Sequence, residues 1–208
     1  MPSSPVHLKV AYLMCDELGI KNKADFILGA ISPDCVNLSG FASEELRYGA
    51  HIRVRDYDLW KKKLVDFYND NKEKYKANSD FLKGYLFHCW TDIAWDEVVQ
   101  PKLFEYLGTL GFGYDDMTKQ KWQELYRFNG KLVREPYFAE VRKLVKAAQP
   151  QNIAACDIDT IIKYRDYVAD DYKDKIYDEE PKFLNDKHID DTMSQMRKQG
   201  YIKQFMGA

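Results

Sequence analysis

The sequence FLKGYLFHCWTDIAWDEVV, from Phe81 to Val99, decides how the rest of the chain is expected to fold. It contains no proline, it follows the N-cap signal Asn78-Ser79-Asp80, and Pro101 lies just beyond its end, so it predicts one continuous helix. Its apolar residues leave almost no polar face, and a helix that is apolar on nearly all sides is normally central. We therefore expect this helix to be the buried centre of an all-α fold.

The same helix carries a histidine and an aspartate four positions apart, His88 and Asp92. Residues with this spacing project from one side of a helix and can hold one metal ion. Buried ionisable groups are found paired or on metals, because an unpaired buried charge is unfavourable. From this helix alone, a core histidine that bonds to Asp92 or to a backbone carbonyl explains the pair equally well. Gly84, one turn earlier on that side, leaves room for another backbone or a ligand.

Composition limits the class of protein. Of 208 residues, 45% are hydrophobic and 31% are charged, which is typical of a globular domain. The net charge of −2 argues against a broad nucleic-acid platform and against a polybasic membrane anchor. No apolar run approaches the ~18 residues that span a bilayer. Four cysteines without pairing motifs, and a start without a leader pattern, predict a reducing, cytoplasmic location.

Helices are expected along most of the remaining chain, because strand signals are scarce. Residues 37–49 are rich in Gly, Ser and Asn and are predicted to form a loop, with or without a turn of helix, and Asn129-Gly130 is expected to separate two helices. Pro150 to Asn152 is the one credible linker, which predicts a helical metal-binding core over 1–149 and a helical extension over 150–208 packed on the same domain. Apolar periodicity predicts further helices at 7–18, 25–31, 57–76, 101–107, 118–128, 137–148, 157–169 and 188–198.

The first half of the chain holds other residues of the metal-ligand type. Only four histidines are present, and His7, His51 and His88 each lie on or beside an apolar segment. Asp34 lies on the turn Ser32-Pro33-Asp34, where the proline stops an apolar helix. Nitrogen and oxygen donors of this kind suit zinc and similar divalent ions.

Four blocks of sequence carry these residues in order. They are His7, Leu28-Gly29-Ala30-Ile31-Ser32-Pro33-Asp34, Ala50-His51-Ile52-Arg53 and Gly84-Tyr85-Leu86-Phe87-His88-Cys89-Trp90-Thr91-Asp92. Together they resemble the successive blocks of the bacterial zinc-dependent phospholipase C family. That family is all-helical, and it is related in fold and metal site to single-strand-specific zinc nucleases. The resemblance covers roughly residues 5 to 100.

The resemblance implies a pair of zinc-type divalent ions. By it, Asp34, His51 and His88 hold one ion. Asp92 bridges that ion to a second one, of which His7 is a further ligand. Two ions at a bridging distance of ~3.5–4 Å stabilise a pentacoordinate phosphorus and the departing oxygen, so the implied reaction is phosphoester hydrolysis with Asp34 and Asp92 as catalytic ligands. The expected substrate is a small-molecule or lipid phosphoester.

The chain departs from that family in two respects. Secreted members use a freed N-terminal amine as a ligand, whereas Met1 lies six residues before His7 in this sequence. They also bind a third ion through later His and Glu residues, whereas His188 is the only later histidine here. Asp96 and Glu97, one turn beyond Asp92, are candidates to complete the second site.

Three residues near these blocks have two interpretations each. Arg53, two residues after His51, is expected either to contact a substrate phosphate or to form a structural ion pair, for example with Asp56. Tyr85 and Trp95 are expected either to line a substrate cleft or to pack in the core.

Two other functions are compatible with the same residues. One is a helical interaction protein without catalysis, stabilised by metal or metal-free, which the missing family ligands favour. The other is a nucleotide phosphohydrolase of another helical metal-dependent type, although the sequence lacks the adjacent His-Asp pair that such enzymes carry.

Overall fold

Helix α5 (Ser79–Val98) lies at the centre of the fold, as the sequence predicts. The structure is a computed structural model that describes residues 1–170, 172, 175–199 and 205. Within these residues it contains ten α-helices, two 3-10 helices and one isolated β-bridge but no strand, which confirms the all-α prediction. The other elements are α1 (Ser4–Met14), α2 (Lys23–Gly29), η1 (Ser32–Asn37), α3 (Glu44–Ala50), α4 (Tyr57–Asn71), η2 (Lys76–Asn78), α6 (Gln100–Thr109), α7 (Tyr114–Arg134), α8 (Tyr137–Ala147), α9 (Ile158–Asp170) and α10 (Asp186–Lys198).

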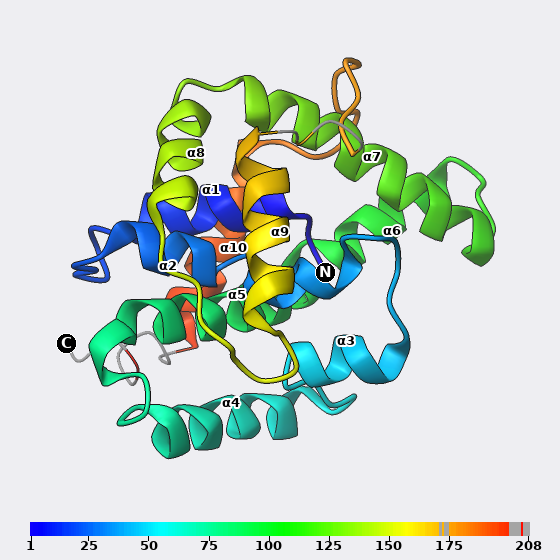
Figure 1. Ribbon diagram of the computed structural model, residues 1–208. Coiled ribbons are helices and arrows are strands. Elements are labelled where there is room, and N and C mark those ends of the chain that lie inside the picture. Colours follow the sequence, from blue (N-terminus) through cyan, green and yellow to red (C-terminus); the bar gives the residue numbers. More distant parts are fainter. Residues whose placement is uncertain (171, 173–174, 200–204, 206–208) are drawn as a thin grey trace.

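Burial on all sides explains the apolar character of α5. Every residue from Asp80 to Trp95 is buried except Lys83. Helices α1, α2, α4 and α10 all pack against α5, and Figure 1 shows them on different sides of it. A polar face would have no water to contact, which is why the sequence of this helix has almost none.

Two glycines allow α2 and α5 to pack backbone against backbone. A Cβ atom on Gly84 would overlap the carbonyl oxygen of Phe26 and lie 2.8 Å from its carbonyl carbon. A Cβ atom on Gly29 would lie 2.8 Å from the amide nitrogen of Tyr85. Only glycine fits such an approach. Because η1 begins three residues after Gly29, this contact brings η1 and Asp34 next to α5.

The sequence prediction was wrong at two loops. Residues 44–49 of the predicted loop form α3 together with Ala50, and the N-cap Ser43 accepts a hydrogen bond from the Leu46 amide. Helix α7 continues through Asn129 and Gly130, where a break was expected. The carbonyl of Tyr177 occupies the space of a Gly130 side chain, so this glycine allows a close approach and does not end the helix.

The described part of the predicted extension packs directly on the preceding helices. Helix α9 contacts α8 and η1, and α10 contacts α5 and α1. Residues 171, 173–174, 200–204 and 206–208 of that extension lie outside the described residues. The extension therefore covers both the η1 side and the α5 side of the fold.

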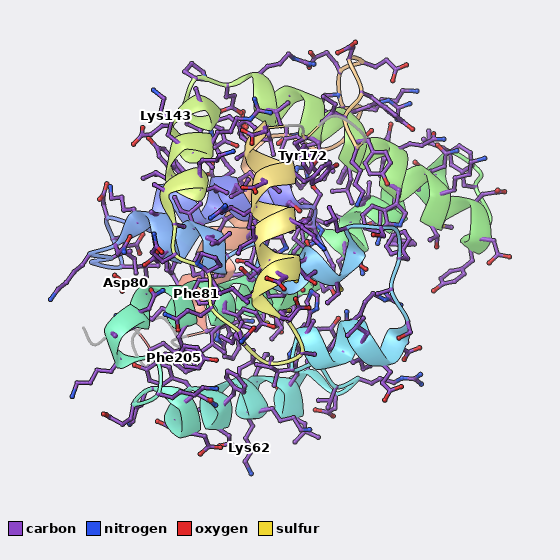
Figure 2. All side chains as sticks on the ribbon, viewed as in Figure 1. Lys62, Asp80, Phe81, Lys143, Tyr172 and Phe205 are labelled. Atoms are coloured by element: carbon purple, nitrogen blue, oxygen red, sulfur yellow. The ribbon has the colours of Figure 1, made fainter. Side chains whose placement is uncertain are left out.

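The surface of the described helices is charged and their interior is apolar. In Figure 2, Lys62 on α4 and Lys143 on α8 extend outward, whereas Phe81 lies inside. Among the described residues, no helix is both long and apolar enough to cross a bilayer.

Candidate metal centre

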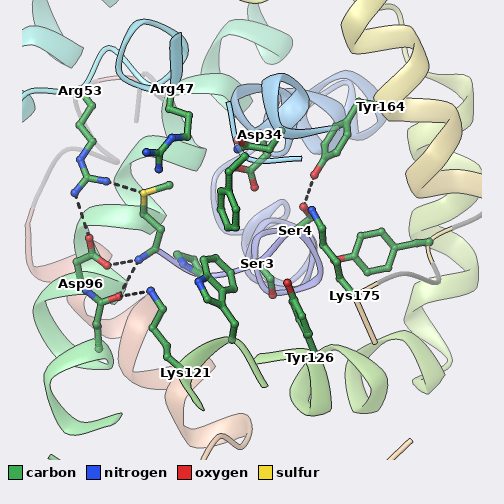
Figure 3. A pocket seen from close by; sticks show the side chains of 17 residues that line it. Ser3, Ser4, Asp34, Arg47, Arg53, Asp96, Lys121, Tyr126, Tyr164 and Lys175 are labelled. Atoms are coloured by element: carbon green, nitrogen blue, oxygen red, sulfur yellow. Dashed lines mark hydrogen bonds and ion pairs between the residues drawn. The ribbon is translucent and has the colours of Figure 1, made fainter. Parts of the chain in front are cut away.

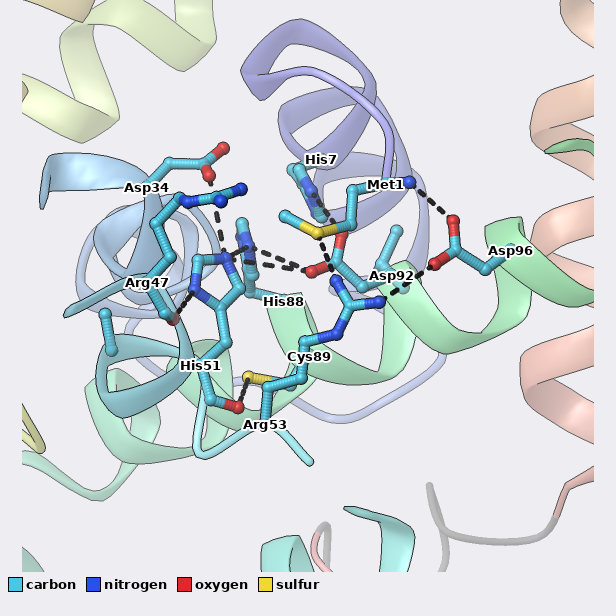
Figure 4. Close-up of polar contacts among 12 residues, drawn as sticks. Met1, His7, Asp34, Arg47, His51, Arg53, His88, Cys89, Asp92 and Asp96 are labelled. Carbon is cyan, nitrogen blue, oxygen red and sulfur yellow. Dashed lines mark hydrogen bonds and ion pairs between the residues drawn. The ribbon is translucent and has the colours of Figure 1, made fainter. Parts of the chain in front are cut away.

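Four elements bring the five predicted ligand residues together (Figure 4). The 3-10 helix η1 carries Asp34, and α5 carries both His88 and Asp92. Of the five predicted ligand side chains, all except Asp34 have at most 1% of their surface exposed, and Asp34 has 15%. The other two predicted ligands are His7 in α1 and His51, the C-cap of α3.

The first group of donors consists of Asp34, His51 and His88. The Nε2 atoms of His51 and His88 are 3.2 Å apart, and Nε2 of His51 lies 3.6 Å from Oδ1 of Asp34. One donor atom from each residue lies within 4.8 Å of the others, so one ion between them would contact all three.

The second group consists of His7, His88 and Asp92. One donor atom from each of these residues again lies within 4.8 Å of the others. The rings of His7 and His88 are stacked, with centroids 3.7 Å apart and an interplanar angle of 14°. Nε2 of His7 lies 3.4 Å from Oδ1 of Asp92, whereas the Nε2 atoms of His51 and His88 each lie 3.7 Å from Oδ2. The two oxygens of Asp92 therefore face different histidines.

Backbone carbonyls fix the orientation of two imidazoles. Nδ1 of His51 is 2.8 Å from the Arg47 carbonyl, and Nδ1 of His88 is 2.8 Å from the Ala30 carbonyl. A carbonyl only accepts hydrogen bonds, so each Nδ1 carries the proton and each neutral ring presents an Nε2 lone pair. Two Nε2 lone pairs 3.2 Å apart repel each other unless a proton or a metal ion lies between them. This arrangement of a carbonyl behind the imidazole is common at metal sites.

Four buried atoms of the centre have no hydrogen-bond partner. They are both ring nitrogens of His7 and both carboxylate oxygens of Asp92. Leaving a buried polar atom unsatisfied costs about 1–3 kcal/mol, and more for a charged group. Cations bound by Nε2 of His7 and by the two carboxylate oxygens of Asp92 would satisfy three of these four atoms. The donor set therefore fits bound metal.

Interactions with neighbouring histidines keep the carboxyl groups of Asp34 and Asp92 ionised. Burial raises the pKa of Asp34, but hydrogen bonding to His51 and the charge of His88 outweigh it and lower the pKa to about 2. Burial likewise opposes ionisation of Asp92, and the histidines around it again lower its pKa overall. Both side chains are thus anionic donors at neutral pH.

The histidine pKa values move in opposite directions. Burial, followed by the charge of His7, lowers the pKa of His88 to about 3. For His51, burial lowers the pKa, but the hydrogen bond to Asp34 and the charges of Asp92 and Asp34 outweigh it, so the pKa is raised. His88 is therefore neutral without any metal, whereas His51 holds a proton more readily than a free imidazole.

Comparisons with known proteins do not assign this centre to a family. No protein-family model, curated protein or solved structure matches the chain significantly. The geometry of the described residues alone therefore supports a possible metal-binding site of buried His and Asp side chains.

The two candidates for completing the second site have other partners. One carboxylate oxygen of Asp96 accepts from the Met1 amine and the other accepts from the Tyr57 hydroxyl, at 3.0 Å. Glu97 accepts from Lys61 and from Gln195, both at 2.8 Å. Neither belongs to the two donor groups.

The two aromatic residues proposed for a cleft lie in the core. Tyr85 and Trp95 are fully buried, and the Tyr85 hydroxyl donates to the Ala50 carbonyl. The described lining of the cavity beside the centre does not include them.

Arg53 instead lines that cavity, which has a volume of about 250 Å³ and also reaches Asp34 (Figure 3). Its guanidinium is 3.8 Å from Asp96 Oδ2 and lies over the Trp60 ring. Asp56, the expected ion-pair partner, caps α4 instead.

Sequence reasoning missed two further cavity residues, Arg47 and Lys121. Arg47 is four positions before His51, so helical spacing would have placed both on one side had 44–50 been predicted as a helix. Lys121 lies on α7, and no local signal connects it to the centre.

Proposed function

We propose that this chain is a metal-dependent phosphoesterase that resembles the zinc-dependent phospholipase C family and holds two zinc-type ions. The proposal is carried by one observation, the convergence of four buried His and Asp side chains and the partly exposed Asp34, with four unsatisfied polar atoms among them. Nitrogen and carboxylate donors without thiolates suit zinc and related divalent ions.

The ligand assignment follows from the available lone pairs. His88 uses Nδ1 on the Ala30 carbonyl, so its Nε2 serves one ion only. We assign that ion to Asp34, His51 and His88. A second ion takes His7, and Asp92 serves both because Oδ1 faces His7 and Oδ2 faces His51 and His88.

A catalytic role is favoured by the opening at Asp34. Structural metal sites are closed by protein ligands, whereas catalytic sites keep a position open. Asp34 lines the cavity, so a substrate in the cavity lies beside the proposed centre. Divalent ions there supply Lewis-acid charge beside a phosphoryl group and lower the pKa of water at the site. Asp34 and Asp92 remain anionic and hold the ions, and the carbonyls of Arg47 and Ala30 hold the imidazoles in place.

A non-catalytic, metal-stabilised protein is the second candidate. One observation favours it: apart from the shared His88, the second donor group contains only His7 and Asp92. If only the first site fills, a single ion would link α3, α5 and η1 and act mainly on stability.

Metal content and hydrolysis measured on the same sample separate these candidates. After dialysis against zinc, elemental analysis should find about two ions per chain, and a nitrophenyl phosphodiester should be hydrolysed. Asp92→Asn should lower turnover about 100-fold or more, because it removes the bridging charge. His188→Gln, on α10 and outside the centre, is the matched control and should bind zinc and turn over normally.

The alternative outcomes are distinct. One zinc ion per chain, raised stability and no turnover would favour the metal-stabilised protein. A chain that retains no zinc, or equal zinc content in Asp92→Asn and the parent, would rule out the proposed centre.

A further inference from the structure

The cavity beside Asp34 is cationic although the chain as a whole is slightly acidic. Its described lining includes four cationic side chains and only two carboxylates, Asp34 and Asp96. If Asp34 holds an ion as proposed, Asp96 is the one carboxylate left to balance the cations. The cationic residues are Arg47, Arg53, Lys121 and Lys175.

Three of these cations line the same cavity and come from two parts of the fold, the α3 region and α7 (Figure 3). Arg47 lies on α3, Arg53 follows α3, and Lys121 lies on α7. Like charges repel, so a cluster of this kind is stabilised when an anion binds between them. Guanidinium groups suit phosphate particularly well, because they donate two parallel hydrogen bonds.

Local partners leave donor capacity on each of the three side chains. Arg47 donates through Nε to the neutral Ala42 carbonyl, and Lys121 donates to the neutral amide of Gln100 at 3.3 Å. Arg53 donates through one terminal nitrogen to the Met1 sulfur, at 2.6 Å, and its other terminal nitrogen lies 3.8 Å from Asp96, whereas its Nε has no hydrogen-bond partner. Burial also lowers the pKa of Lys121, as expected for an ammonium group whose charge is incompletely compensated.

Part of the described cavity lining is aromatic and does not form an acyl-chain groove. Phe41 is 70% exposed and packs on Trp122, with ring centroids 5.6 Å apart, and Tyr126 belongs to the same lining. A cavity of about 250 Å³ with this lining fits a compact polar molecule. Two long acyl chains would find no apolar channel there.

We propose that Arg47, Arg53 and Lys121 bind a second anionic group of the substrate, so that the preferred substrates are soluble phosphoesters carrying two phosphoryl groups. This inference rests on the proposed function, which places the reacting phosphoryl group at the centre beside Asp34. The second phosphoryl group then occupies the cavity and orients the molecule without reacting.

Binding of inorganic phosphate to the metal-free protein tests the anion site without relying on turnover. Calorimetry should detect binding in the parent protein, and Arg53→Gln and Lys121→Gln should each weaken it about tenfold. Arg55→Gln and Lys119→Gln are matched controls: Arg55 pairs with Glu44 on the surface, and Lys119 is exposed on α7. Circular dichroism verifies folding, and the two test variants lie on different elements, so misfolding of one leaves the other informative.

Turnover of the zinc-loaded protein tests the substrate class. Fructose 1,6-bisphosphate should have a KM about tenfold lower than fructose 6-phosphate, and Lys121→Gln should remove that difference with little change in kcat. Dihexanoylphosphatidylcholine, which lacks a second anion, should be a poorer substrate than the bisphosphate.

The outcomes separate this inference from the proposed function. Suppose that the nitrophenyl diester is hydrolysed. If phosphate binding and the KM difference are then absent, or if neither variant changes them, the anion site is wrong and the proposed function stands. If no ester is hydrolysed but phosphate binding is lost in the two variants, the function is wrong and the anion site stands. Faster turnover of the phosphatidylcholine than of the bisphosphate would overturn the proposed substrate class.

Discussion

Gly84 of α5 lies directly against the backbone of Phe26 in α2, and a Cβ atom there would be 2.8 Å from the Phe26 carbonyl carbon. This contact sets the distance between the helix that carries His88 and the segment that leads to Asp34. Replacing Gly84 by alanine should therefore destabilise the protein by about 3 kcal/mol, because two backbones must separate. Urea unfolding followed by circular dichroism measures the change.

Gly108→Ala is the control for that substitution. Gly108 also lies inside a helix, but its added Cβ atom would meet only the Met117 methyl group, at 3.9 Å. Alanine there should leave stability unchanged or raise it by up to about 1 kcal/mol. Equal effects of the two substitutions would show that the α2–α5 approach is not tight.

Zinc should stabilise the folded protein. An ion that binds only the folded chain contributes about 2.7 kcal/mol at 100 times its dissociation constant, which is about 5–10 °C in Tm for a chain of this size. Differential scanning fluorimetry with zinc and then with EDTA measures the shift and its reversal. Asp92→Asn should lose most of the shift and His188→Gln should keep it.

The metal-free protein should lose stability as the pH falls below about 6.5. Because burial and the charge of His7 lower the pKa of His88 to about 3 from 6.5, the unfolded chain takes up a proton in this range that the folded chain does not. The stability contributed by neutral His88 is present above pH 6.5 and is lost towards pH 3. Asp34 adds a loss between its usual pKa of 3.8 and about 2.

His51 acts in the opposite direction. Its pKa is raised, so its contribution is present below the unfolded value of 6.5 and is lost as the pH rises through the folded value. Urea unfolding of EDTA-treated protein at about pH 7 and about pH 5 gives the net slope, which should be positive with pH and smaller in His88→Gln. A slope unchanged by that substitution would contradict the assignment.

Arg47 should separate the metal centre from the anion site. Its backbone carbonyl holds His51, whereas its side chain lines the cavity. Arg47→Gln keeps the carbonyl, so zinc content should equal that of the parent, while phosphate binding should weaken about tenfold. Loss of zinc together with phosphate binding would mean that the side chain supports the centre itself.

The sequence allowed α5, and the position of His88 and Asp92 on one side of it, to be predicted because the signals are local. A proline-free apolar run identifies a buried helix, and the four-residue spacing of His88 and Asp92 places both on one side of it. That His7, Asp34 and His51 would meet them was expected from the family resemblance, since no local pattern connects residues on different elements.

The features that could not be predicted depend on tertiary contacts. Gly130 looks like a helix end in the sequence, but the Tyr177 carbonyl that requires it comes from a segment far along the chain. The net charge of −2 likewise conceals the cationic cavity, because only the fold brings Arg47 and Lys121 together.

Locating zinc by anomalous scattering in crystals of the zinc-loaded protein tests the central claim most directly. We predict two peaks about 3.5–4 Å apart, with Asp92 in contact with both. Asp34, His51 and His88 should surround one peak and His7 should contact the other. A zinc-saturated crystal without a peak among these five residues would contradict the account.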